Sequence, residues 1–474
     1  MLKNIISLII AFSFVFPYFK KDPIMIGLSG AYSTLASGYN TVGVNPANLA
    51  FSDGISINLM NMNLNLSNNF LTRSRMQNIN GADLDNPNAE KYYPKDEILG
   101  YLDGKRIKFL SISKFLIPTF NFSKNKFAIN SEIKIFSELQ LSPDLIDMVL
   151  NGNTVGREYD LSMNNTNIII LESSFSKAFD LDPVGIGFSI RYLKGLCYYD
   201  LNPINDSYVL TDTTEFVSKA RYVLEQHMYG DGLSLDIGIV TKENDRGWKL
   251  GISFINLFGD IKWNKKNTLD EPLEAFYDSL PYEENESYLV NLSIENLNID
   301  VLNDFSLSDI YDIDAESVYE VNVQPNGVDG DHYFCSSKEC DTFYVNSDDY
   351  AIDNEEIVKS KIIKQDYPTS MFIGISKKIN QHSSFIIDLS TGLDNTLGNT
   401  EKWRVAIGYT LSTKRLPLRI GMSYGGYDEK SFSFGSGLHF KKIHIDFGIS
   451  FKGAMNFSRI KGIDFGVNMN WINF

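Results

Sequence analysis

The sequence predicts an all-β protein, a transmembrane up-and-down antiparallel β-barrel of about fourteen strands. Three observations lead to this fold class. Apolar and small polar residues alternate with period two near the C-terminus, no run after the N-terminus approaches the length of a spanning helix, and short and long joins alternate between the expected strands. Only helices and closed barrels satisfy every backbone hydrogen bond inside a bilayer, so a chain without spanning helices can cross it only as a barrel.

The composition is that of a chain with enough apolar material for a sizeable ordered structure. Its 474 residues are 43% hydrophobic and include 3 cysteines, which excludes a disordered chain and a small disulfide-stapled domain. The formal net charge of −16 argues against a nucleic-acid binder, which needs a basic surface. The segment from Asp270 to Lys359 holds 24 acidic and 2 basic residues, so the acidity belongs to this one segment.

The N-terminus has the layout of a secretory signal peptide. Lys3 precedes the apolar run 5–16, which is followed by the basic pair Lys20-Lys21. This run is too short for a membrane span, which needs roughly 20 residues, so we assign residues 1–22 to a signal peptide. The cleavage point stays open, and an uncleaved anchor or a strand is the alternative.

Alternation near the C-terminus separates two faces of each expected strand. In the segment 443–451, one face is wholly apolar and the other consists of His444, Asp446, Gly448 and Ser450. The strand of a soluble sandwich also alternates, but its outer face is charged. Here the second face is rich in glycine, serine and asparagine, and aromatic residues are common on the apolar face. This combination is typical of a transmembrane barrel with an apolar exterior and a polar lumen.

Joins of two kinds separate the expected strands. The fourteen strands are expected at about 55–66, 107–122, 126–138, 166–178, 184–196, 231–241, 247–257, 369–378, 383–392, 402–411, 417–425, 431–440, 443–451 and 462–472. Short joins such as 123–125 would lie on the periplasmic side and long joins outside, as in outer-membrane barrels. The barrel then occupies 53–474 with a large acidic external loop at 264–366, and a possible strand at 288–294 is left out of the ring.

The stretch after the signal peptide carries a family resemblance. Residues Ile24–Phe51, IMIGLSGAYSTLASGYNTVGVNPANLAF, contain a glycine pair at Gly27 and Gly30 and then the tripeptide Asn45-Pro46-Ala47. This pattern resembles the opening of the FadL-type outer-membrane channel family and of its relative PorV from type IX secretion. Later pieces that are also similar lie at 251–263, 367–392 and 417–427.

The resemblance implies a plug and a function. In that family this stretch fills the barrel lumen, so we expect a lumen plug at 23–52 with the gating residues Gly27, Gly30, Asn45, Pro46 and Ala47. The protein would be a monomer in the outer membrane of a Gram-negative bacterium, in contact with outer-membrane lipid, and would take up hydrophobic small molecules such as fatty acids passively. The alternative is a PorV-like scaffold for protein secretion or surface attachment, whose partner is an exported surface protein. Neither function requires a catalytic residue or a cofactor.

The third expected strand departs from the family pattern. Family members are thought to release ligand through a kink in this strand. Residues 127–136 contain neither glycine nor proline, the two residues that most often interrupt a strand. The sequence therefore argues against lateral exit of a ligand at this point.

Several polar residues are expected to face the lumen. They are Arg404, Arg419, His439, His444 and Asp446. The two histidines would face each other across a two-residue turn, with Asp446 on the same face. A His/Asp pair can act as a general base, but no nucleophile pattern accompanies it, so a polar lumen wall is the preferred interpretation and no catalytic site is expected.

A helix is expected in the third long join. The segment Thr213–Met228 places Phe216, Val217 and Val223 on one helical face. In the resembling family, helices in external loops form a hydrophobic entry groove, so this helix is a possible ligand lip. A loop helix that only packs on the barrel rim is the alternative.

The acidic loop shows no metal-binding pattern. No stretch has the spacing of a twelve-residue calcium loop, so we expect a solvated, mutually repelling surface and no metal site. Cys335 and Cys340 could form a disulfide in an exported protein, which would leave Cys197 unpaired.

Overall fold

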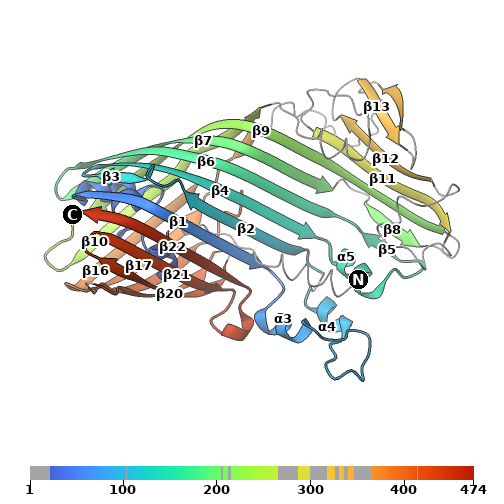
Figure 1. Cartoon of the computed structure of the whole chain (residues 1–474), viewed down its shortest axis with the longest axis horizontal. Coiled ribbons are helices and arrows are strands. Elements are labelled where there is room, and N and C mark those ends of the chain that lie inside the picture. The colour runs from blue at the N-terminus through green and yellow to red at the C-terminus, as the bar shows by residue number, and fades with distance from the viewer. Residues whose placement is uncertain are drawn as a thin grey trace.

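Fourteen antiparallel strands close into a barrel, because the last strand pairs with the first (Figure 1). The computed structural model describes residues 22–102, 104–203, 207–211, 215–264, 287–298, 318–325, 330–335, 340–345, 364–413, 415–426 and 428–473. Around the wall the strands are β1 (Ile55–Asn68), β2 (Ile107–Leu116), β4 (Phe127–Leu141), β6 (Met163–Asp180), β7 (Val184–Pro203), β9 (Glu215–Thr241), β10 (Trp248–Asn264), β16 (Ser370–Asn380), β17 (Ser383–Gly392), β18 (Arg404–Leu411), β19 (Leu418–Gly425), β20 (Lys430–Phe440), β21 (Ile443–Lys452) and β22 (Gly462–Asn473). The predicted fold class is confirmed. The predicted signal peptide, up to residue 21, lies outside the described residues.

The two faces of the strands differ as the alternation predicts. On β19, the exposed fractions of Leu418, Ile420, Met422 and Tyr424 run from 46% to 66%, whereas Arg419 is buried. Exposing apolar side chains to water is unfavourable by roughly 25 cal/mol per Å² of apolar surface. An exterior that exposes them on strand after strand is suited to lipid.

The second expected strand, 107–122, is broken in two. After β2 the backbone leaves the ladder at residues 117–121, and β3 (Phe122–Lys124) resumes pairing with β1 and β4. Pro118 has no N–H to give to a ladder. The side chain of Asn121 replaces the missing bonds, since it accepts from the N–H of Ser131 at 2.8 Å and donates to the carbonyl of Ile117 at 2.7 Å.

The third strand of the ring runs without interruption. β4 pairs with β6 over its whole length, from Phe127 to Leu141, with no shift of register. The wall as a whole is uneven in height. β9 has 27 residues, whereas β18 and β19 have 8 each.

The N-terminal part of β9 pairs with further strands that form an external sheet beyond the ring. There β8 (Tyr208–Thr211) pairs with one edge of β9 and β11 (Ser287–Asn298) with the other. The sheet continues through β12 (Val318–Pro325), β13 (Gly330–Cys335) and β14 (Cys340–Val345), with β5 (Glu158–Asp160) beyond β8. In addition, β15 (Lys364–Asp366) pairs with β10.

This sheet changes the interpretation of the acidic segment 264–366. The segment is not a plain loop, because four strands of the external sheet lie within it. The possible strand 288–294 falls in β11, which pairs with β9 and β12 and takes no place in the ring. Cys335 and Cys340 are register partners in the hairpin of β13 and β14, and their side chains lie outside the described part of the chain.

The predicted helix at Thr213–Met228 is wrong. Residues from Glu215 onward belong to β9, where Val217 pairs with Leu210 and Val223 with Asn202. The apolar residues of this segment satisfy a period of 3.6 locally, but pairing with strands on both edges satisfies its backbone and decides for a strand. Phe216, Val217 and Val223 therefore form no helical ligand lip, and nothing is described of the Phe216 and Val223 side chains.

The described helices are short, and none of them is part of the ring of strands. They are α2 (Pro23–Gly27), η1 (Gly38–Thr41), η2 (Pro46–Phe51), α3 (Arg73–Ile79), α4 (Lys95–Gly100), α5 (Pro143–Asn151) and η5 (Phe457–Arg459). Within the described ranges, none of the helices has both the length and the apolar character needed to cross a bilayer. Short turns gather at one end of the barrel, while α3, α4, α5 and the external sheet gather at the other, which we call the external end (Figure 1).

Candidate functional site

Residues 22–52, the N-terminal segment, are buried against the lumen face of the strands. Of these residues only Ser37 is exposed. Two caps start its short helical turns: Asp22 accepts from the N–H of Met25 at 2.9 Å, and Asn45 accepts from the N–H of Ala47 at 3.0 Å. Such caps stabilise turns too short to form alone.

Glycines allow the first half of the segment to approach the wall closely. A Cβ on Gly27 would lie 2.7 Å from the Cα of Gly435 on β20. Gly30 has a φ of +90°, and a Cβ there would lie 2.5 Å from a guanidinium nitrogen of Arg404. Gly421 and Gly448 face the same half, and a side chain on either would overlap its backbone. The small residues of this wall therefore make room for the segment.

The second half of the segment packs on the opposite wall. Asn45 donates to the carbonyl of Ile239 on β9 at 3.3 Å. Side chains added at Gly187 on β7 or Gly238 on β9 would overlap the Asn45-Pro46-Ala47 tripeptide. The residues predicted from the resemblance as a gating group thus all contact the barrel wall or lie next to such a contact.

Three side chains from the wall tether the segment. Asp388 accepts from the backbone N–H groups of Tyr32 and Ser33, each at 2.7 Å. Lys249 donates to the carbonyl of Thr34 at 2.9 Å and to Asn48 at 2.8 Å. Arg404, one of the residues expected to face the lumen, donates to the carbonyl of Ser29 and to the Ser423 hydroxyl.

The other expected lumen residues form one cluster near the short turns. Arg419 and Asp446 make an ion pair at 2.8 Å, and His439 Nε2 lies 3.2 Å from the same carboxylate oxygen. The rings of His439 and His444 stack with centroids 3.9 Å apart. Since Arg419 already engages the Asp446 carboxylate, this geometry fits a polar wall better than a general base.

A pocket, the lumen pocket, lies on the external side of the N-terminal segment. Gly43 of the segment is one of its lining residues, and its apolar lining comes from Ile112, Phe136, Ile168, Ile170, Ile255, Pro368, Phe372 and Leu397. Polar lining comes from Lys134, Asn256, Tyr367, Ser370 and Asn399. The pocket encloses about 790 Å³ of empty space, including some that is open to solvent. Apolar walls with a few polar groups are typical of small-molecule sites.

A second pocket, the external groove, lies among the helices of the external end. It is lined by apolar residues alone: Phe70, Leu71, Met76, Ile79, Ile98, Ile107, Phe109, Ile146, Val149 and Leu150. These residues come from α3, α4 and α5 and from the strand ends beside them. The sequence predicted an external apolar lip in a different join, at Phe216, Val217 and Val223, and missed this one.

One apolar cluster joins the groove to the pocket. Ile107 and Phe109 of β2 line the groove, while Ile112 of the same strand lines the pocket, and all three belong to a single buried cluster. Phe70 of the groove and Leu397 of the pocket pack against the same cluster. Buried apolar side chains thus pack together around the external end of β2, with Ile107 and Phe109 on one face of the strand and Ile112 on the other.

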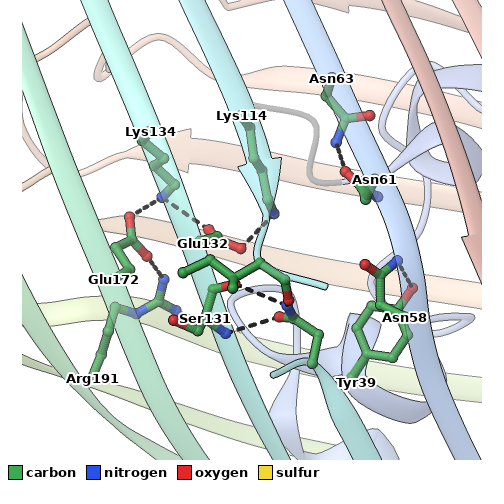
Figure 2. A network of polar contacts seen from close by, with 12 residues as sticks. Tyr39, Asn58, Asn61, Asn63, Lys114, Ser131, Glu132, Lys134, Glu172 and Arg191 are labelled. Atoms are coloured by element: carbon green, nitrogen blue, oxygen red, sulfur yellow. Dashed lines mark hydrogen bonds and ion pairs between the residues drawn. The ribbon is translucent and has the colours of Figure 1, made fainter. Parts of the chain in front are cut away.

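A belt of buried ion pairs crosses the wall beside the pocket (Figure 2). We call this set the ion-pair belt; its members are Lys114, Glu132, Lys134, Glu172, Arg191 and Asp236. Lys114 lies 2.7 Å from Glu132, Lys134 pairs with Glu172, and Arg191 bridges Glu172 and Asp236. The sequence analysis missed this belt, although its residues sit at lumen-facing positions of the alternation.

An amide row continues the belt toward β1 and β22 (Figure 2). Asn58 donates to the Tyr39 hydroxyl and to Asn470, each at 3.1 Å, and Asn63 donates to Asn61 at 3.0 Å. Tyr39 belongs to the N-terminal segment, so this row also holds the segment. The belt and the amide row together make this part of the lumen wall polar.

Comparison with known proteins finds distant matches among solved structures. No family model and no curated protein matches the chain. Among solved structures, the toluene transporter TbuX of Ralstonia pickettii is 10% identical with a TM-score of 0.49, covering 96% of this chain and 98% of its own. A FadL homologue of Pseudomonas aeruginosa is 13% identical with a TM-score of 0.46, covering 97% and 99%, and the toluene transporter TodX of P. putida is 11% identical with a TM-score of 0.48, covering 95% and 98%.

Likenesses this distant carry no function, and the architecture itself decides the location. A closed antiparallel barrel, an apolar exterior and a polar lumen occur together in one setting. The chain is an outer-membrane β-barrel. In such a barrel the short turns are periplasmic and the external groove faces the medium.

Proposed function

We propose that this outer-membrane barrel is a channel for the passive uptake of hydrophobic small molecules. The observation that carries the proposal is the apolar cluster that links the external groove to the lumen pocket. A hydrophobic molecule gains roughly 25 cal/mol for each Å² of its surface that leaves water. The groove would collect such molecules, and a concentration gradient alone would drive them on, without a catalytic group or a cofactor.

The N-terminal segment is the proposed gate. It lies below the lumen pocket, and its residues Gly27, Gly30, Asn45, Pro46 and Ala47 hold it close to both walls. A molecule in the pocket would reach the periplasm only after the segment shifts. The tethers from Asp388, Lys249 and Arg404 set how easily that happens.

Uptake by intact cells tests the proposal. Gram-negative cells that lack their own channels for hydrophobic compounds would express the protein and receive radiolabelled naphthalene. We expect the initial rate of uptake to rise severalfold over cells with an empty vector. A charge in the groove, Ile98→Asp, should return the rate to that of the empty vector, because it puts a solvated carboxylate on an apolar surface.

The matched control is Glu97→Gln, on the same helix but outside the groove lining. It should take up naphthalene like the wild type. If wild-type protein, present in the outer membrane, gives no more uptake than the empty vector, the uptake proposal fails.

The external sheet supports a second candidate function, a scaffold for an exported surface protein. Strands β11 to β14 extend the wall beyond the membrane within the strongly acidic segment, which gives a partner a large docking surface. A pull-down in mild detergent would test it, with a variant lacking residues 299–363 as the comparison. A partner retained by the wild type and lost by the variant supports the scaffold, and equal recovery contradicts it.

A further inference from the structure

The charge around the lumen pocket carries information about the ligand. Among the pocket's lining residues that the structure describes, Lys134 is the one with a charge. An anionic ligand such as a fatty-acid carboxylate would need this ammonium group as its counterion. Whether Lys134 is available therefore decides which ligands the pocket can hold.

Lys134 is fully engaged by its neighbours. Its ammonium group pairs with Glu172, lies 3.5 Å from Glu132, and donates to the Tyr367 hydroxyl at 3.0 Å. The Tyr367 hydroxyl in turn donates to Glu172. These groups are packed together away from solvent, since the Lys134 side chain is 14% exposed and the Glu172 side chain 2%.

The ion-pair belt as a whole is electrically balanced. It contains three cations, Lys114, Lys134 and Arg191, and three carboxylates, Glu132, Glu172 and Asp236. Each cation contacts at least one of the carboxylates, and Lys134 and Arg191 each contact two. Figure 2 shows the part of this chain of contacts that runs from Lys114 to Arg191.

A carboxylate that entered the pocket would meet one of two obstacles. It could displace Glu172 or Glu132 from Lys134, which would leave that glutamate buried without its partner. Otherwise it would stay in an apolar pocket without a counterion, which is costly for a charged group. An uncharged ligand meets neither obstacle, and the polar side chains of Asn256, Ser370 and Asn399 also line the pocket.

We propose that the lumen pocket selects uncharged, largely apolar molecules with a hydrogen-bonding group and rejects carboxylates, and that Glu132 and Glu172 are the specificity-determining residues. This inference rests on the proposed function, and it replaces fatty-acid anions with neutral compounds as the substrate class. It predicts that removing one negative charge from the ion-pair belt will allow the lumen pocket to bind an anion.

Binding of two ligands that differ only in head group tests this inference. The full-length protein in detergent would be titrated calorimetrically at pH 7.5 with 1-dodecanol and with dodecanoate. We expect wild-type protein to bind dodecanol about tenfold or more tightly than dodecanoate. In Glu172→Gln, which leaves the belt with one excess positive charge, the affinity for dodecanoate should rise about tenfold while that for dodecanol changes little.

Two further variants keep the test independent of folding. Glu132→Gln should shift the preference in the same direction, and it serves if Glu172→Gln does not fold, as judged by heat-modifiable gel mobility. Glu243→Gln, at a half-exposed ion pair on the short-turn side, should leave the preference unchanged.

The outcomes separate the inference from the proposed function. The charge-selection proposal is overturned if the wild type binds both ligands equally, or if the preference is unchanged in both Glu132→Gln and Glu172→Gln. Either result leaves the uptake proposal standing. If neither dodecanol nor dodecanoate binds the wild type or the variants, that result counts against the proposed function itself.

Discussion

The two walls of the lumen differ in the side chains that they present to the interior. The wall formed by β18 to β22 has strands of 8 to 12 residues, and where the N-terminal segment touches it, glycine lets the two backbones approach as closely as Gly27 does to Gly435. The wall formed by β2 to β9 rises to the 27 residues of β9, and beside the lumen pocket it carries the long charged side chains of the ion-pair belt, which neutralise one another. Alternation of apolar and polar residues is common to both walls, so it does not by itself say what the lumen contains.

The two walls are therefore expected to be destabilised by different kinds of substitution. Where Gly27 meets Gly435 on the β18 to β22 wall, the fit is steric, and an added methyl group has no space. In the ion-pair belt on the β2 to β9 wall, the fit is electrostatic, and loss of one charge leaves others buried without compensation. Substitutions in each wall test this difference.

The largest effect is expected at Arg191, which is 1% exposed and bridges Glu172 and Asp236. Arg191→Met should destabilise the barrel by about 3–5 kcal/mol, since two buried carboxylates lose their partner. Urea unfolding in detergent micelles, followed by gel mobility, measures this. Arg246→Met, at an exposed turn, is the control and should change stability by less than about 0.5 kcal/mol. Equal effects at the two positions would show that the belt is not needed for stability.

A smaller effect is expected in the β18 to β22 wall. Gly27→Ala places a methyl group against the backbone of Gly435, and overpacking of this kind costs about 1–3 kcal/mol. The barrel should remain folded while the N-terminal segment detaches, which limited proteolysis of this segment would detect. Gly100→Ala, where an added Cβ meets no atom within 4 Å, should leave the cleavage pattern unchanged. Resistance to protease in both variants would contradict the close-packing argument.

The smallest effect is expected at the cap of η2. Asn45→Ala removes the acceptor for the N–H of Ala47 and the bond to Ile239, at a cost of about 1 kcal/mol. If the segment is the gate, naphthalene uptake should change measurably in this variant and in Pro46→Ala. Asn456→Ala removes an equivalent cap from η5, outside the lumen, and should not affect uptake. Unchanged uptake in the Asn45 and Pro46 variants would falsify the gating proposal.

The sequence by itself determined the ring. Period-two alternation and the order of short and long joins located all fourteen strands, because the residues of each strand alternate between its two faces. The same local reasoning failed at Thr213–Met228, where one apolar face fits a helix as well as a strand and only the partners on both edges of β9 decide.

Only the tertiary structure decided which residues meet in the lumen. Lys134 and Glu172 lie on neighbouring strands, but Tyr367 comes from a distant part of the chain, and nothing in its local sequence predicts that it joins them. The groove between α3, α4 and α5 likewise draws on two separate joins. The physical reason is that alternation is a property of one strand, whereas register and closure of the barrel fix the neighbours of every side chain at once.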